Sequence, residues 1–139
     1  MESGVRSEKI HIPLNKPVSF SNHHFKEGIE NMTINEYQKL AMVTLNPELD
    51  KKDVLINGVM GLCGESGEAI DIVKKHLAQG HELDKEELAK ELGDVAWYLA
   101  ETATAIGYDL EDIFQMNIDK LKKRYPEGFS VEKSVNRNE

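Results

Sequence analysis

Residues 61–99 read GLCGESGEAIDIVKKHLAQGHELDKEELAKELGDVAWYL and decide the fold of this chain. The stretch contains two acidic pairs, each with its members three residues apart: Glu65 with Glu68, and Glu91 with Asp94. Residues three apart share one face of a helix, so each pair places two carboxylates on one side of its own helix. The centre of the arrangement falls at Gln79-Gly80. A chain reversal there predicts two antiparallel helices with four acidic side chains at about the same height.

Four carboxylates at one height predict a bound cation. Two like charges about 4 Å apart repel by about 4 kcal/mol at an effective dielectric of about 20. Hard oxygen ligands favour Mg²⁺, with Mn²⁺ as the other candidate. A solvated acidic face is the alternative, because 25 acidic residues in 139 produce such pairs by chance. The apolar runs around both pairs favour the metal site, since carboxylates set among them are partly buried and need partners.

Length and composition limit the class of protein. A chain of 139 residues is long enough for one domain with a real core. The net charge of −8 argues against a general binder of nucleic acid, which normally carries a basic face. Cys63 lies in an apolar helical run and is interpreted as a small core residue. The first twenty residues lack the apolar region of a signal peptide, and no run is long enough for a membrane span, so we expect a cytoplasmic, soluble protein.

The chain divides into three parts. Residues 1–31 contain Pro13 and Pro17 and no sustained helical period, which predicts an extended or disordered N-terminal arm. Their histidines have no nearby cysteine or helical histidine partner and are interpreted as surface residues. Residues 32–130 form the predicted helical domain, and residues 131–139 a C-terminal tail.

The helical domain is predicted to be all-α, with about four helices. The first begins at the capping box Thr33-Ile34-Asn35-Glu36 and ends before Pro47. The second runs from about residue 52 to residue 76 or 78, and Gly80-His81 makes the turn. Asp84 caps the third, Gly107 stops it, Asp109 caps the fourth, and Pro126-Glu127-Gly128 terminates that one. A buried stripe on the third helix is predicted to contain Leu88, Leu92, Val95, Leu99 and Ile106.

The fourth helix carries a basic face. Asn117, Lys120 and Arg124 lie at i, i+3 and i+7 and therefore share one side. Arg binds an oxyanion in bidentate fashion and Lys acts as a point charge, so this face suits a phosphate chain. A second interpretation stays open, in which the basic residues of the last turn only complement the helix dipole.

Three segments together resemble the MazG-like nucleotide pyrophosphohydrolases. They are GESGE at 64–68, ELGDVAWYL at 91–99, and the stretch from Asn117 through Arg124-Tyr125-Pro126-Glu127-Gly128-Phe129. The 22 residues between Glu68 and Glu91 are a spacer that this family tolerates, and the resemblance covers about residues 33–130. It implies a four-helix MazG-like bundle whose core depends on oligomerisation, and an enzyme that hydrolyses a nucleoside triphosphate to the monophosphate and pyrophosphate with Mg²⁺.

The resemblance also implies roles for individual residues. The four carboxylates Glu65, Glu68, Glu91 and Asp94 would hold one or more Mg²⁺ ions, and one of them would assist the metal-activated water as a base in attack at the α/β phosphate junction. Lys120 and Arg124 would contact the phosphates, with Asn117 near the sugar or phosphates. Tyr98 shares a face with Asp94 and is a candidate nucleotide contact, or else a buried tyrosine with a satisfied hydroxyl group. Gln38 in the first helix is a candidate contact to the base.

Assembly and substrate leave several alternatives. The apolar excess beside Trp97 predicts that a second subunit covers the open side of the site, giving a homodimer, or a homotetramer by resemblance. The substrate could instead be dUTP, dCTP or phosphoribosyl-ATP. A di-iron carboxylate bundle is disfavoured, because the Glu-x-x-His motif is missing. A non-catalytic helical interaction module, with solvated acids, is the alternative from another class.

Overall fold

The described part of the computed structural model, residues 32–136, is built from helices and contains no strand. The elements are α1 (Ile34–Ala41), a 3₁₀ turn η1 (Met42–Thr44), α2 (Lys51–Gln79), α3 (Lys85–Ile106), α4 (Leu110–Arg124) and α5 (Val131–Val135). The all-α prediction is therefore confirmed. The short α5 lies in the segment that the sequence analysis assigned to a tail, and the arm expected over residues 1–31 lies outside the described residues.

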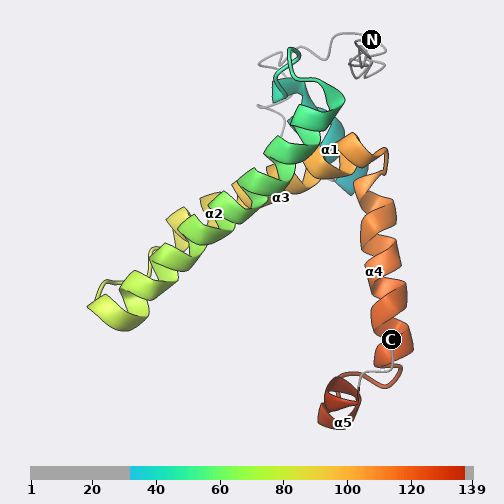
Figure 1. The fold of residues 1–139 in the computed structure, drawn as a ribbon. Helices are drawn as coiled ribbons and strands as arrows, with labels where there is room; N and C mark the ends of the chain where they lie inside the picture. The colour runs from blue at the N-terminus through green and yellow to red at the C-terminus, as the bar shows by residue number, and fades with distance from the viewer. Residues whose placement is uncertain (1–31, 137–139) are drawn as a thin grey trace, which may run out of the picture.

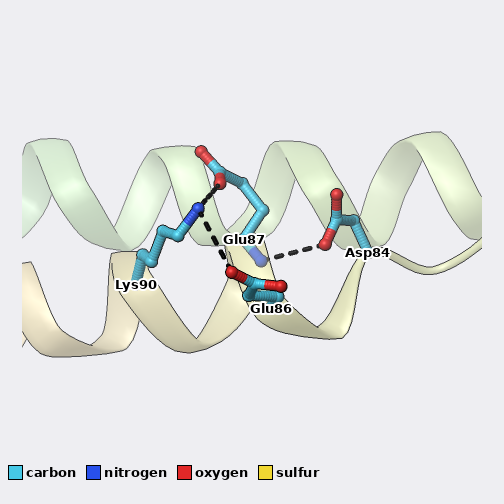
Figure 2. Close-up of polar contacts among 4 residues, drawn as sticks. All are labelled: Asp84, Glu86, Glu87 and Lys90. Carbon is cyan, nitrogen blue, oxygen red and sulfur yellow. Dashed lines mark hydrogen bonds and ion pairs between the residues drawn. The ribbon is translucent and has the colours of Figure 1, made fainter.

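Local signals place most helix ends where the sequence predicts them. The Thr33 side chain accepts a hydrogen bond from the Glu36 backbone and the Glu36 side chain reaches back, which completes the capping box. Asp84 Oδ1 accepts from the backbone N–H of Glu87 at 2.9 Å, and Lys90 Nζ lies 3.0 Å from Glu87 Oε2 (Figure 2). Gly80 ends α2 with a φ of 74°, a left-handed conformation that glycine adopts without strain.

Helices α2 and α3 form a long antiparallel hairpin that extends from the rest of the molecule (Figure 1). Two glycines of α2 allow close approach. A Cβ at Gly58 would lie 2.5 Å from Thr102 Oγ1 and 3.3 Å from Thr102 Cα. A Cβ at Gly61 would lie 2.1 Å from Cε1 of Tyr98. The two helices therefore touch at these positions in a way that a larger residue would prevent.

The buried core lies at one end of the hairpin, where α1, η1 and the start of α4 pack against it. We call this region the hub; its buried apolar residues are Met42, Leu45, Val54, Ala100, Ala103, Ala105 and Leu110. Gln38 of α1 is buried among them: its Nε2 donates to Thr104 Oγ1 and to the Tyr108 carbonyl, both at 3.1 Å. Its Oε1 accepts from the backbone N–H of Leu110 at 2.6 Å.

The start of α4 is capped by side chains that are distant in the sequence. Asp109 occupies the predicted N-cap position, but its side chain makes no capping hydrogen bond. The orphan N–H groups of Leu110 and Glu111 are instead bound by the side chains of Gln38 and Asn35, the second at 3.2 Å. Helix α1 thus supplies the cap that local sequence assigned to Asp109.

Two predictions about burial are wrong for the single chain. Leu92 and Ile106, expected in the buried stripe of α3, are 57% and 50% exposed. Cys63, expected in the core, is exposed as well. For Leu92 and Cys63 the reason is that the hub covers only one end of the hairpin, so apolar residues farther out on α2 and α3 have no element within residues 32–136 to pack against. Ile106 is the last residue of α3, at the hub end, and its side chain remains exposed there.

Candidate active site

Three carboxylates from the two hairpin helices converge. Glu65 on α2 and Glu91 and Asp94 on α3 each offer one oxygen atom, and these atoms all lie within 4.8 Å of one another. Gly80 reverses the chain between them, as the spacing predicts. Glu65 and Glu91 are half-buried, and Asp94 is exposed. Glu68 is exposed and lies outside this group of three.

The electrostatics of the cluster are those of crowded like charges. Burial raises the pKa of the Glu91 carboxyl, and the negative charges of Glu68, Glu65 and Asp94 raise it further. Glu68 therefore acts on the cluster through its charge. None of the ion pairs among residues 32–136 involves these four carboxylates. A cation placed here would relieve the repulsion.

The donor set fits a hard divalent cation. Carboxylate oxygens are the ligands that Mg²⁺ and Mn²⁺ prefer, and Mg²⁺ in nucleotide enzymes is commonly held by few carboxylates together with substrate phosphates and water. Glu65, Glu91 and Asp94 supply three such oxygens from two rigid helices. Part of the cluster remains open, which leaves room for further ligands.

An open pocket of about 420 Å³ adjoins the cluster and is lined by Glu65, Asp94, Trp97 and Tyr98. Trp97 Nε1 donates to Thr44 Oγ1 at 2.8 Å and to the Ala41 carbonyl at 3.1 Å, so the ring is tied to the hub. The Trp97 and Tyr98 rings meet edge to face, with centroids 5.0 Å apart. Carboxylates and an aromatic pair therefore line the same pocket.

Tyr98 keeps its phenolic proton in this setting. Burial raises the pKa of the Tyr98 hydroxyl, and the charges of Glu65, Glu101 and Asp94 raise it further. The hydroxyl is therefore a hydrogen-bond donor at neutral pH. Trp97 was not predicted as a site residue; its position next to Tyr98, three residues after Asp94, was the available signal.

The basic face of α4 does not join the cluster within one chain. Asn117, Lys120 and Arg124 all lie on α4, and none of them lines the pocket. Helix α4 packs against α1 and α3 and then runs in a different direction from the hairpin (Figure 1). Asn117 and Lys120 are exposed, and Arg124 is half-buried.

Gln38 also lies apart from the pocket. Its side chain is buried in the hub, and both its amide nitrogen and its oxygen are bound inside the fold. These contacts describe a residue that joins α1 to α3 and α4. Its contact to a nucleotide base stays a prediction.

A comparison with known protein families matches the part of the chain that contains the cluster. A family model described as the MazG nucleotide pyrophosphohydrolase domain matches residues 57–129, more than half of the chain, and includes the cluster, the pocket and the basic face. The chain is also similar to the Gene 37 protein of Mycobacterium phage L5, with 38% identity over 73 residues. That match covers 50% of this chain and 64% of the phage protein's length. No solved structure matches. The chain belongs to the MazG nucleotide pyrophosphohydrolase domain family.

Proposed function

We propose that the protein is a Mg²⁺-dependent nucleoside triphosphate pyrophosphohydrolase, which converts an NTP or dNTP to the monophosphate and pyrophosphate. The observation that carries the proposal is the convergence of Glu65, Glu91 and Asp94 within 4.8 Å beside an open pocket, inside the region that matches the family. Mn²⁺ is the alternative metal, and the number of ions is left open.

The residues of the cluster and of the pocket would have different roles in the reaction. Glu65, Glu91 and Asp94 would hold Mg²⁺, with Glu68 adding negative charge, and the ion when bound would neutralise phosphate charge and lower the pKa of a water molecule. A carboxylate of the cluster would accept the proton of the attacking water. The aromatic pair Trp97–Tyr98 offers a surface for the nucleoside, and the Tyr98 hydroxyl offers it a hydrogen bond.

A second copy of the chain would complete the site. Part of the outer hairpin is an apolar groove of about 400 Å³, lined by Ala69, Ile70, Val73, Lys74, Leu77 and Leu88. Leu77 is 77% exposed in the single chain, and large exposed apolar surfaces mark interaction sites. A homodimer would cover this surface, and it could bring Lys120 and Arg124 of one copy toward the phosphates bound by the other. A homotetramer is the larger alternative.

The membrane plays no part in this proposal. Across residues 32–136 no helix combines the length and the hydropathy that a bilayer span requires. A location in the cytoplasm stays a prediction.

The test is a substrate panel. Canonical and modified NTPs and dNTPs, dUTP and dCTP included, and phosphoribosyl-ATP are incubated with the protein and Mg²⁺ or EDTA. Monophosphate plus pyrophosphate, formed only with the metal, is the expected result, and the preferred nucleotide selects among the alternatives. Folded protein that turns over none of them, and that Mg²⁺ does not stabilise against heat, would point to the non-catalytic helical module.

A further inference from the structure

Besides the carboxylate cluster, α2 and α3 share a buried polar contact, which lies one helical turn from the pocket, toward the hub. Glu101 on α3 is 0% exposed, and both of its carboxylate oxygens lie 3.0 Å from the donor Nδ2 of Asn57 on α2. Burial raises the pKa of the Glu101 carboxyl, and the Asn57 hydrogen bonds partly offset this. Within residues 32–136 no Lys or Arg forms an ion pair with Glu101. Among residues 32–136, the Asn57 amide is thus the one side-chain hydrogen-bond partner of this buried acid.

Packing alone does not account for an acid at this position. Replacing buried charged groups by well-packed apolar side chains of similar volume is often neutral or stabilising. The neighbouring buried residues Ala100 and Ala103 are apolar, as a helix interface requires. A buried polar residue that costs stability is a candidate for a role in function.

The position of the pair along the helices suggests that role. Three successive contacts run along the seam between α2 and α3: Asn57 with Glu101, Gly61 with Tyr98, and Glu65 with Asp94. Each step of four residues along α2 is matched by a step of three or four back along α3. Tyr98 is therefore held between the buried pair on one side and the carboxylate cluster on the other.

The Tyr98 ring is sensitive to the spacing of the two helices. A Cβ at Gly61 would lie 2.1 Å from Cε1 and 2.4 Å from Cζ of this ring, so the ring lies directly against the α2 backbone. Any slide or separation of α2 relative to α3 would move the ring in the pocket. The Asn57–Glu101 hydrogen bonds, one helical turn away, oppose such a slide because they are directional.

We propose that Asn57 and Glu101 form a positioning pair, which fixes the register of α2 against α3 and thereby holds Tyr98 in the nucleotide pocket. The inference rests on the proposed function in one respect, the contact of Tyr98 with the nucleotide. Neither member of the pair lines the pocket, so both act through Tyr98.

An exchange of the two side-chain chemistries tests the pair in the full-length protein. Asn57→Asp sets a second carboxylate against Glu101 and removes the donor. Glu101→Gln is the milder change, because the Asn57 amide can still donate to the remaining side-chain oxygen at position 101. The double variant N57D/E101Q restores one amide donor and one carboxylate acceptor with their places exchanged. Glu82→Gln is the matched control, because it removes an exposed carboxylate from the connection between the same helices.

Two readouts separate positioning from stability. Near-ultraviolet circular dichroism follows the packing of Trp97 against Tyr98, and steady-state kinetics give KM and kcat for the preferred nucleotide. We expect Asn57→Asp to raise KM about tenfold, with a smaller change in kcat and a weaker aromatic signal. Glu101→Gln should change KM less, because it keeps one hydrogen bond to Asn57. The double variant and Glu82→Gln should both stay near the wild-type values.

Two results would overturn the inference: a folded Asn57→Asp variant with wild-type KM and aromatic signal but a lower Tm, or a double variant that is no better than Asn57→Asp. If a single variant does not fold, a folded double variant with wild-type KM supports the pair, and an unfolded one refutes it. A wild-type protein without nucleotide turnover would refute the proposed function instead. The aromatic signal and its recovery in the double variant would still decide the pair.

Discussion

The hub and the outer half of the α2–α3 hairpin differ in how many of their apolar side chains are buried and how many of their polar side chains are hydrogen-bonded within the chain. In the hub, Val54 and Leu110 are buried and the Gln38 amide is bound on both sides. In the outer hairpin, Leu77 and Leu92 are largely exposed, and oxygen atoms of three carboxylates lie within 4.8 Å of one another. The hub can therefore hold the fold of one chain. The hairpin presents exposed apolar side chains, which a second subunit can cover, and clustered carboxylates, which a metal ion can bind.

The largest expected effect is on the chemistry, with little on the fold. Glu91→Gln or Asp94→Asn should lower kcat/KM by at least about a hundredfold, because each removes a ligand oxygen from the cluster. The metal-free variants should melt slightly above the wild type, since one repelling charge is gone. Pyrophosphate release and calorimetric melting measure the two effects, with Glu82→Gln as control. Near-normal turnover in both variants would remove these residues from the site.

The complementary experiment destabilises the hub and leaves the carboxylate cluster unchanged. Leu110→Ala should lower the free energy of unfolding by about 2–5 kcal/mol, because it leaves a cavity in the only well-closed core of the described chain. Denaturant unfolding measures it. The exposed Leu77→Ala on the hairpin serves as the comparison at protein concentrations below those at which copies associate. An equal loss at both positions would contradict the division between hub and hairpin.

Gln38 tests the same division between hub and hairpin, because the sequence predicts it in the site and the structure places it in the hub. Gln38→Ala should cost about 1–3 kcal/mol of stability, since the Leu110 N–H and the Tyr108 carbonyl lose their partner. KM should not change in the folded variant if the role is structural. A raised KM at unchanged Tm would restore the predicted contact to the base.

Substitutions on the basic face of α4 test whether α4 and the α2–α3 hairpin contribute to one site. Lys120→Ala and Arg124→Ala should each raise KM about tenfold, because each removes a charge-assisted contact to phosphate, while Tm stays within error. Kinetics at two salt concentrations are the measurement. Lys122→Ala, on the same helix but off this face, is the control. Equal effects of all three substitutions would indicate general electrostatic attraction.

The smallest effect concerns pH. The pKa of Glu101 is raised in the folded protein, so its protonated form is favoured there. The resulting stabilisation is fully present below the unfolded-state pKa near 4.5 and is lost as pH rises through the folded-state value. Glu101→Gln should therefore flatten the stability profile above pH 4.5, as measured by denaturant unfolding at several pH values. An unchanged slope would mean that Glu101 does not contribute to it.

Much of the fold could be predicted because its signals are local. The capping box at Thr33, the cap at Asp84 and the glycines at 80 and 107 all act within one helical turn, and the structure uses each of them. The convergence of acidic residues from α2 and α3 was also predictable, because a reversal at Gly80 and a helical period fix which turns of the two helices face each other. The structure groups three of the four expected carboxylates, Glu65, Glu91 and Asp94. The burial of individual side chains was harder to predict from the sequence. Cys63 and Leu92 are apolar residues on long helices, and their exposure depends on where the other elements stop.

The helical class, most helix ends and the meeting of acidic residues from α2 and α3 could be read from the sequence, since these follow from backbone periodicity and short-range hydrogen bonds. Tertiary packing, in contrast, was needed to see that α1 caps α4 through Gln38 and that Glu101 is buried against Asn57. It also decided that the basic face of α4 leaves the hairpin. The α1–α4 cap and the Glu101–Asn57 contact join residues 72 and 44 positions apart, and all three features depend on how whole helices pack.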